Sequence, residues 1–219
     1  GPISASLRTF IGVMSMPKAD RIDNDVLLKA GLELMRLNGK PLKKRASKGR
    51  SMIYELPSGE TVRSRTCNDH ILIVVADKAS ADAHLNIEGT DWLFIVMPEI
   101  ERTEGKIIGY LVPVAEAVKE VRQAHQNWLA SNPKTKGSNT TWNIWFDGNG
   151  PGKSNNYAEK WKKYRLEGSV STLELPGEES SSLGDTAKLK LEVEAARKRI
   201  ADMAGVLPGS VKISIDFGI

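Results

Sequence analysis

The sequence predicts an α+β or mixed α/β domain: a central sheet, mostly antiparallel or mixed, flanked by helices, with a C-terminal helix–strand appendage. Two observations predict this class. Helical and strand patterns are interspersed along the chain, which is typical of a layered domain and excludes a repeat protein or a helix bundle. An apolar content of 40% over 219 residues suffices for one buried core plus an appendage, or for two small domains.

Composition and turn residues divide the chain into four parts. Residues 1–22 are an N-terminal extension, and the first two have the form of a protease-cleavage scar from recombinant expression. Residues 23–166 carry the predicted core domain. Residues 167–185 are rich in Ser, Gly and Glu and predict a linker, and residues 186–219 predict a separate helix–strand unit.

The core begins with an amphipathic helix. An apolar stripe through Leu27 and Leu34 predicts a helix over 25–38, with Asp23 or Asn24 as its N-cap. Three strands are predicted next, over 51–56, 61–66 and 70–76. A Pro-Ser-Gly turn joins the first strand to the second, and an Asn-Asp pair joins the second to the third.

Two apolar strands and a long helix follow. Residues 91–99 contain an unbroken apolar run, as in a strand buried on both faces, and residues 106–113 repeat the signal. Residues 115–130 give the strongest helical pattern of the chain. Residues 141–146 alternate, which places Trp142, Ile144 and Phe146 on one side of a strand.

Two further helices are predicted toward the C-terminus. The first covers 155–166 and carries the aromatic residues Tyr157, Trp161 and Tyr164 along one stripe. The second covers 186–203 with apolar residues at heptad spacing, stops at Gly205 and precedes a strand over 211–217. Two heptads are too few for an isolated coiled coil, so we expect this unit to pack on the main sheet or to form a homodimer.

The net charge of +4 and the pI near 9.1 are modest, but the cations are concentrated. Residues 39–50 hold Lys40, Lys43, Lys44, Arg45, Lys48 and Arg50 and no acidic residue. Residues 153–165 hold Lys153, Lys160, Lys162, Lys163 and Arg165 against one Glu. Arg63 and Arg65 share one face of their predicted strand. These cations predict a surface that faces a polyanion, the alternative being a solvated loop and a solvated helix face.

We do not expect the Gly-Lys-Ser at 152–154 to form a nucleotide-binding P-loop. That motif needs a glycine five positions before Gly152, where this chain has Asp147, and Pro151 removes one of the N–H donors. The stretch therefore predicts a turn that leads into a helix.

Metal, disulfide and membrane chemistry are not expected. The single cysteine, Cys67, excludes an intramolecular disulfide and a CxxC-type zinc site, and the chain has three histidines in total. No apolar run approaches the length of a membrane span. We therefore expect a cytoplasmic protein with no metal site, no cofactor and no membrane partner.

The segment DWLFIVMPEIERTEGKIIGYLVP, with the helix and hairpin before it and the long helix after it, resembles the core of the PD-(D/E)XK nucleases. The resemblance covers about residues 23–130. In that family an Asp on one strand and an acid-x-Lys on the next hold Mg²⁺ and position water for phosphodiester cleavage. The resemblance implies catalytic roles for Asp91, Glu104 and Lys106.

This chain departs from the family pattern at the acid-x-Lys. Glu104 and Lys106 precede their strand, whereas the family places the acid inside it, where this chain has Gly109, Tyr110 and Leu111. The resemblance therefore implies a degenerate core that binds nucleic acid without cutting it. Mg²⁺ is expected as a cofactor only if the site is active.

We predict a soluble, bacterial-type DNA-binding protein that makes phosphate contacts through the basic loop and the basic-aromatic helix and has no catalytic activity. Two alternatives stay open. One is a Mg²⁺-dependent endonuclease of the PD-(D/E)XK type. The other is a non-catalytic assembly or interaction subunit, in which the charges are incidental.

Overall fold

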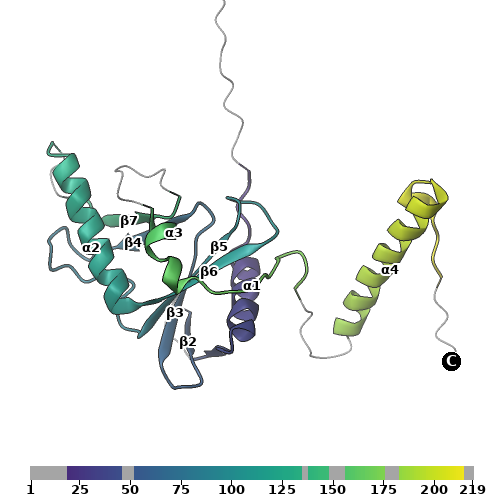
Figure 1. The fold of residues 1–219 in the computed structure, drawn as a ribbon, viewed down its shortest axis with the longest axis horizontal. Coiled ribbons are helices and arrows are strands. Elements are labelled where there is room, and N and C mark those ends of the chain that lie inside the picture. The colour runs from purple at the N-terminus through teal and green to yellow at the C-terminus, as the bar shows by residue number, and fades with distance from the viewer. Residues whose placement is uncertain (1–18, 46–51, 135–137, 148–155, 176–182, 215–219) are drawn as a thin grey trace, which may run out of the picture. The chain divides into compact units, whose positions relative to one another are not determined.

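The structure is a computed structural model that describes residues 19–45, 52–134, 138–147, 156–175 and 183–214. The chain falls into two compact units, Gly1–Glu174 and Leu175–Ile219. The first unit contains both sheets (Figure 1). Within the described residues, no helix combines the length and the apolar composition that a bilayer crossing requires.

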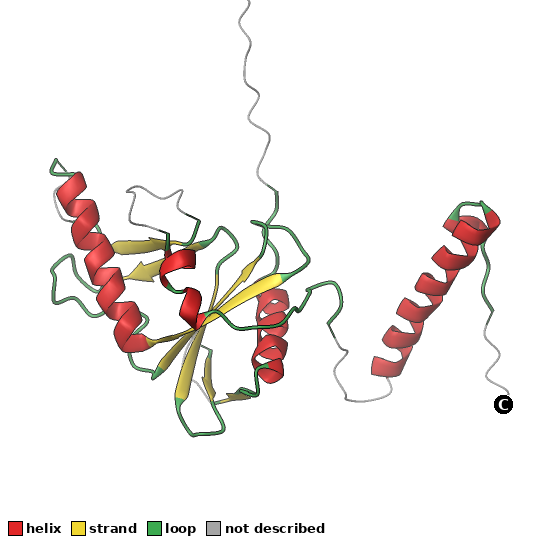
Figure 2. Cartoon of the chain, in the orientation of Figure 1, coloured by secondary structure: helices red, strands yellow, loops and turns green. Residues whose placement is uncertain are grey.

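The first unit is built on two sheets (Figure 2). The main sheet has the strand order β1-β2-β3-β5-β6, and β4 pairs with β7 in a two-stranded sheet. The β3–β5 pair is parallel, and the other pairs are antiparallel. The strands are β1 (Lys43–Lys44), β2 (Ile53–Glu55), β3 (Thr61–Thr66), β4 (Ile71–Val75), β5 (Trp92–Pro98), β6 (Ile107–Pro113) and β7 (Thr141–Trp145). A mixed sheet flanked by helices confirms the predicted α+β class.

Helix α1 (Asn24–Leu37) covers one face of the main sheet. Asp23 is its N-cap, and its carboxylate accepts a hydrogen bond from the N–H of Asp25 at 2.9 Å. Gly31 faces β5 so closely that a Cβ built on it would lie 2.5 Å from Cγ2 of Val96 and 3.1 Å from the ring of Phe94. The absence of a side chain at Gly31 thus sets the distance between helix and strand.

The opposite face of the main sheet carries the larger core. Helix α2 (Val114–Ser131) and the two-stranded sheet contribute to one buried cluster with Leu93, Ile95 and Met97 of β5. Figure 1 shows α1 and α2 on opposite sides of the main sheet. Trp142 of β7 is 2% exposed, as its alternating pattern predicts. Strand β5 is therefore buried on both faces, which confirms the interpretation of its apolar run.

The strand predicted over 70–76 is present as β4, but it leaves the main sheet. Strand β5 occupies the edge of β3, and the pairing continues past β3, where the N–H of Cys67 donates to the carbonyl of Val96 at 2.8 Å. The buried side chain of Asn68 bonds the backbone N–H and carbonyl of Ile22 at 3.0 and 2.9 Å. These contacts direct the chain out of the sheet, and β4 then pairs with β7.

The helix predicted over 155–166 is wrong in its length. Among the described residues, this region has one helical turn, α3 (Tyr157–Lys160), and a 3-10 turn, η1 (Lys162–Tyr164). Tyr157 and Trp161 are each 1% exposed, and their rings pack edge to face at 4.9 Å. Beyond η1 the N–H of Leu166 donates to the carbonyl of Gly109 at 2.9 Å. The chain thus continues along the edge of β6, not as a helix.

The first half of the predicted linker over 167–185 belongs to the first unit. Val170 is buried, and its carbonyl accepts a hydrogen bond from the N–H of Ile107 at 3.0 Å. The N–H of Thr172 donates to the carbonyl of Gly105 at 2.9 Å. Because these bonds are made by the backbone, the Ser- and Gly-rich composition did not reveal them. The first unit accordingly extends to Glu174, eight residues past the predicted boundary at residue 166.

The second unit contains helix α4 (Leu183–Ala204) and the 3-10 turn η2 (Pro208–Ser210). The helix ends before Gly205, whose φ of 65° is the left-handed conformation expected of a helix stop. The strand predicted over 211–217 is absent from residues 211–214, and residues 215–217 lie outside the described residues. Met203 and Leu207 are 84% and 78% exposed, which leaves them accessible to a second chain. A homodimer contact through this unit stays a prediction.

We predict that Gly31→Ala destabilises the first unit by about 1–3 kcal/mol, because the added methyl group overpacks the contact with Val96. The sign of this change in the free energy of unfolding is informative, because in an ordinary helix position replacing Gly by Ala stabilises the helix by about 1 kcal/mol. Urea unfolding monitored by tryptophan fluorescence measures the change.

The control is the exposed Lys29→Ala on the same helix, which should leave the free energy of unfolding nearly unchanged. Combining Gly31→Ala with Val96→Ala should cost less than the sum of the two single changes, because the methyl group then occupies the vacated space. Stabilisation by Gly31→Ala would show that helix and strand can move apart freely.

Candidate nucleic-acid interface

The described part of the first basic stretch lies on the surface where α1 ends. Gly39 has a φ of 70°, which turns the chain out of the helix and toward β1 at the edge of the main sheet. The cations of this segment are all exposed. They are Lys40, Lys43, Lys44 and Arg45. Arg45 is 3.5 Å from a carboxylate oxygen of Glu55, and 51% of its side chain stays exposed.

A pair of hydrogen bonds brings the second basic stretch to the same place. The side chain of Asn38 donates to the carbonyl of Glu167 at 2.8 Å and accepts from its N–H at 3.2 Å. Lys40 is two residues from Asn38, and Arg165 is two residues from Glu167. The two stretches are far apart in sequence, yet this contact joins them around the C-terminal end of α1.

We call the cations of these two joined segments the basic stripe. Its members are Lys40, Lys43, Lys44, Arg45, Lys162, Lys163 and Arg165. Lys162 and Lys163 protrude from η1 while the neighbouring Trp161 points into the core. Lys162 lies 4.0 Å from Glu159, an exposed contact that neutralises little of its charge. Lys163 lies over the ring of Tyr164 at 4.9 Å.

Lys160, predicted for the interface, is placed differently. Its ammonium group lies 3.4 Å from a carboxylate oxygen of Glu120 on α2 and 5.1 Å from the ring centre of Tyr157. These contacts hold the charge against the protein, so Lys160 is left out of the basic stripe.

Arg63 and Arg65 do share one face of β3, as predicted, but their guanidinium groups serve the protein itself. Arg63 donates to the carbonyl of Glu88 at 3.2 Å, and Arg65 donates to the carbonyl of Asn86 at 3.4 Å. Both side chains are half-buried, and burial lowers the pKa of each. The pair therefore holds the loop before β5, and the structure does not present it as an open phosphate-binding surface.

Three predicted contact residues lie outside the described residues. They are Lys48, Arg50 and Lys153.

The three residues implied by the nuclease resemblance are not brought together. Asp91 precedes β5 at the end where Trp92 pairs with Pro113, whereas Glu104 and Lys106 precede β6 at the end where Ile107 pairs with Pro98. The length of β5 separates them, about 20 Å at about 3.3 Å per residue. Lys106 instead lies 3.6 Å from Glu99. One ion cannot contact all three side chains.

Asp91 has a local structural contact. Its carboxylate accepts hydrogen bonds from the backbone N–H of Thr61 at 2.8 Å and from the Thr61 hydroxyl at 3.0 Å. The Thr61 N–H, followed by the hydroxyl, holds the pKa of Asp91 below its ordinary value. These bonds join the start of β3 to the start of β5, the parallel pair of the main sheet.

Cys67 is not poised as a nucleophile. The thiol is 4% exposed, and burial raises its pKa to about 12. A thiol with such a pKa stays protonated at neutral pH, and the thiolate is the reactive form. Cys67 therefore belongs to the core.

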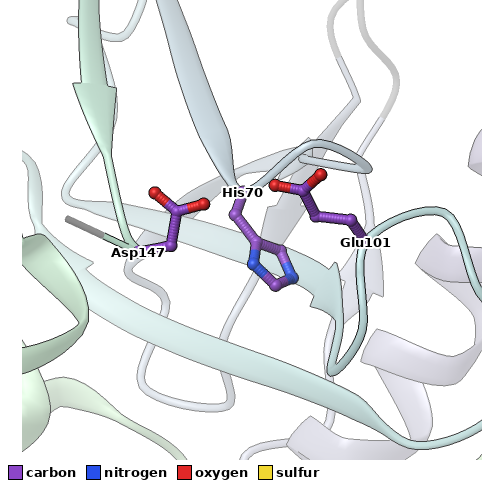
Figure 3. Close-up of side chains that lie close together, drawn as sticks. All are labelled: His70, Glu101 and Asp147. Carbon is purple, nitrogen blue, oxygen red and sulfur yellow. The ribbon is translucent and has the colours of Figure 1, made fainter. Parts of the chain in front are cut away.

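One cluster of potential metal ligands was not predicted. His70, Glu101 and Asp147 place a ring nitrogen and two carboxylate oxygens within 4.8 Å of one another (Figure 3). The residues come from three separate loops, and no sequence spacing links them. The one available signal is that each residue lies at the end of a predicted strand or in a turn, where functional side chains gather.

Comparisons of the chain with protein-family models, with curated proteins and with solved structures gave no match. The resemblance to the PD-(D/E)XK nucleases therefore stays a prediction.

We predict that Asp91→Ala lowers the stability of the first unit at pH 7 and that this deficit shrinks in acid. A carboxyl group whose folded pKa is lowered stabilises the fold above its ordinary pKa of 3.8, and this contribution is lost as the pH falls through the folded value. Thermal unfolding of both proteins from pH 7 to pH 2.5 measures the difference.

Glu104→Ala, which removes an exposed carboxylate at the far end of the sheet, is the control and should track the wild type throughout. A deficit for Asp91→Ala that stays constant down to pH 2.5 would contradict the assigned role of the carboxylate.

Proposed function

We propose that the protein binds duplex DNA through phosphate contacts made by the basic stripe. The observation that carries the proposal is the hydrogen-bonded contact between Asn38 and Glu167. It joins the segments that carry the two runs of cations at the C-terminal end of α1. Exposed Lys and Arg gathered on a protein surface are the electrostatic footprint of a nucleic-acid-binding protein.

The charges of the stripe are available to a ligand. Lys43 and Lys44 are exposed on β1, and the side chain of Lys162 is 74% exposed. Arg63, Arg65 and Lys160, by contrast, bond to groups of the protein itself. Phosphate binding by the stripe thus competes only with exposed, weak contacts, namely the pairs Arg45–Glu55 and Lys162–Glu159 and the packing of Lys163 on Tyr164.

The proposed contacts are to the DNA backbone and not to the bases. Stacking of bases on Tyr157 and Trp161 is not available, because each is 1% exposed. The cations themselves lie on a loop, a two-residue strand and a 3-10 turn, none of which is a helix long enough to enter a major groove. We therefore expect binding with little sequence preference and strong salt dependence.

The two alternative functions have less support. A nuclease that uses Asp91, Glu104 and Lys106 would need these residues at one end of the sheet, and β5 separates them. An assembly subunit is favoured by the exposed apolar residues of the second unit, Met203 and Leu207 among them. The exposure of those residues does not indicate which partner would bind them. An assembly function also gives the basic stripe no role.

We predict that neutralising Lys43, Lys44 and Arg45 together lowers the slope of log affinity against log salt concentration by about two to three, since each phosphate contact contributes about 0.9. A fluorescence-anisotropy titration of a labelled 20-base-pair duplex at several salt concentrations measures the slope. Parallel titrations with single-stranded DNA, with Mg²⁺ and with EDTA test strand preference and cleavage; the duplex should stay intact in all of them.

The matched control changes Lys78, Lys119 and Lys134 to Ala, three exposed lysines outside the stripe. It removes the same three charges, so the net charge falls from +4 to +1 in both variants. The control should keep the wild-type slope. Equal losses in both triple variants would mean that net charge alone governs binding, and an unchanged slope in both would remove the stripe from the interface.

We predict a different signature for Asn38→Ala. This change keeps every cation but removes both side-chain bonds to Glu167, so the two halves of the stripe are no longer fixed to one another. Affinity should fall by up to about tenfold, equivalent to about 1.4 kcal/mol, while the salt slope stays the same. A wild-type affinity for Asn38→Ala would show that the two segments do not bind as one surface.

A further inference from the structure

The cluster of His70, Glu101 and Asp147 has the composition of a metal site. His70 lies just before β4, Glu101 lies in the turn between β5 and β6, and Asp147 lies just after β7. In Figure 3 the two carboxylates lie on either side of the imidazole ring. One ring nitrogen and one oxygen from each carboxylate all lie within 4.8 Å of one another.

The imidazole of His70 is held in the form that a metal ion requires. Its Nε2 is 2.6 Å from the backbone carbonyl of Pro98. A carbonyl oxygen only accepts hydrogen bonds, so Nε2 carries a proton, which leaves Nδ1 as the ring nitrogen that can bind a metal ion. Metal-binding histidines characteristically donate their second N–H to a carbonyl or a carboxylate in this way.

Bonds of the neighbouring residues hold together the three backbone segments that carry the cluster. On one side, Arg102 forms a two-pronged ion pair with Asp69, at 2.5 and 3.2 Å, and its N–H donates to the carbonyl of Asn68 at 3.2 Å. These bonds join the immediate neighbours of His70 and Glu101. On the other side, the N–H of Phe146 donates to the carbonyl of His70 at 3.0 Å, which sets Asp147 beside the ring.

Unusual backbone conformations also occur at the cluster of His70, Glu101 and Asp147. Within the described residues, the non-glycine residues with a positive φ are His70, at 56°, and Arg102, at 53°. One belongs to the cluster and the other follows Glu101 directly. Side chains disfavour this conformation, and it persists where the surrounding contacts impose it, often at functional sites.

We propose that His70, Glu101 and Asp147 bind a divalent transition-metal ion of the Zn²⁺ class. One imidazole nitrogen and two carboxylate oxygens are the mixed ligands that such ions accept, whereas Mg²⁺ and Ca²⁺ favour sets of oxygen ligands. Tetrahedral bonds of about 2.0–2.1 Å place the ligand atoms about 3.4 Å apart. The exposed side chain of Glu101 can close this gap by rotation. Three protein ligands leave a fourth position for water or a further ligand.

The site does not depend on nucleic-acid binding, and its test uses the metal alone. Isothermal titration of the metal-free full chain with ZnCl₂ should show one ion bound per chain, with MgCl₂ giving no comparable heat. His70→Asn, Glu101→Gln and Asp147→Asn should each weaken Zn²⁺ binding by about tenfold or more. Asn is chosen at position 70 because it tolerates a positive φ. Far-UV circular dichroism checks that each variant is folded.

Two matched controls locate the ion. His84→Asn removes an exposed imidazole whose Nδ1 lies 3.3 Å from a carboxylate oxygen of Glu88, an arrangement able to imitate the site. Glu104→Gln removes an exposed carboxylate from the same turn as Glu101. Both should bind Zn²⁺ within about twofold of the wild type. The proposal is overturned if the wild type binds no Zn²⁺, if Mg²⁺ binds as tightly, or if His84→Asn loses binding while His70→Asn and Glu101→Gln keep it.

Discussion

The burial of β5 on both faces is the constraint on which the first unit depends. Its even-numbered residues Phe94 and Val96 pack against α1, and its odd-numbered residues join the core beneath α2 and the small sheet. Helix α1 on one face and the core on the other face must both pack against β5 at contact distance. On one side that distance is set by Gly31, which has no side chain, and on the other by large interlocking side chains such as Trp142. Each end of β5 leads into a loop that positions polar groups.

The sequence predicts the elements that are long and regularly patterned. The helix beginning after Asp23, the buried run of β5 and the long helix α2 all follow from periodicity and capping. Periodicity does not reveal pairing partners, so the departure of β4 from the main sheet depends on bonds such as those of Asn68, which no local pattern records. The helix predicted over 155–166 was wrong in its length, because the backbone beyond η1 bonds to β6 and does not continue as a helix.

In the candidate sites, too, the sequence predicts local features but not the contacts between distant segments. Clusters of cations are visible in the sequence, but their exposure is a tertiary property: Arg65 is covered by the loop it supports, and Lys44 is open to solvent. The joining of the two basic stretches rests on Asn38, a residue whose local sequence signals only a helix end. His70, Glu101 and Asp147 meet because three loops are tied to one another by backbone bonds and by the ion pair of Arg102 with Asp69. No spacing rule contains that information.

The segment that runs along β6 has a consequence for association between chains. An unpaired strand edge is a template for pairing with another chain and thus for aggregation. The N–H of Leu166 and the carbonyl of Val170 bond to β6 and occupy part of its outer edge. The other edge of the main sheet is β1, two residues long, with a lysine at each position. A short, charged strand repels a second copy of itself, so the lysines proposed to attract a polyanion also help to keep identical chains from adding to the sheet.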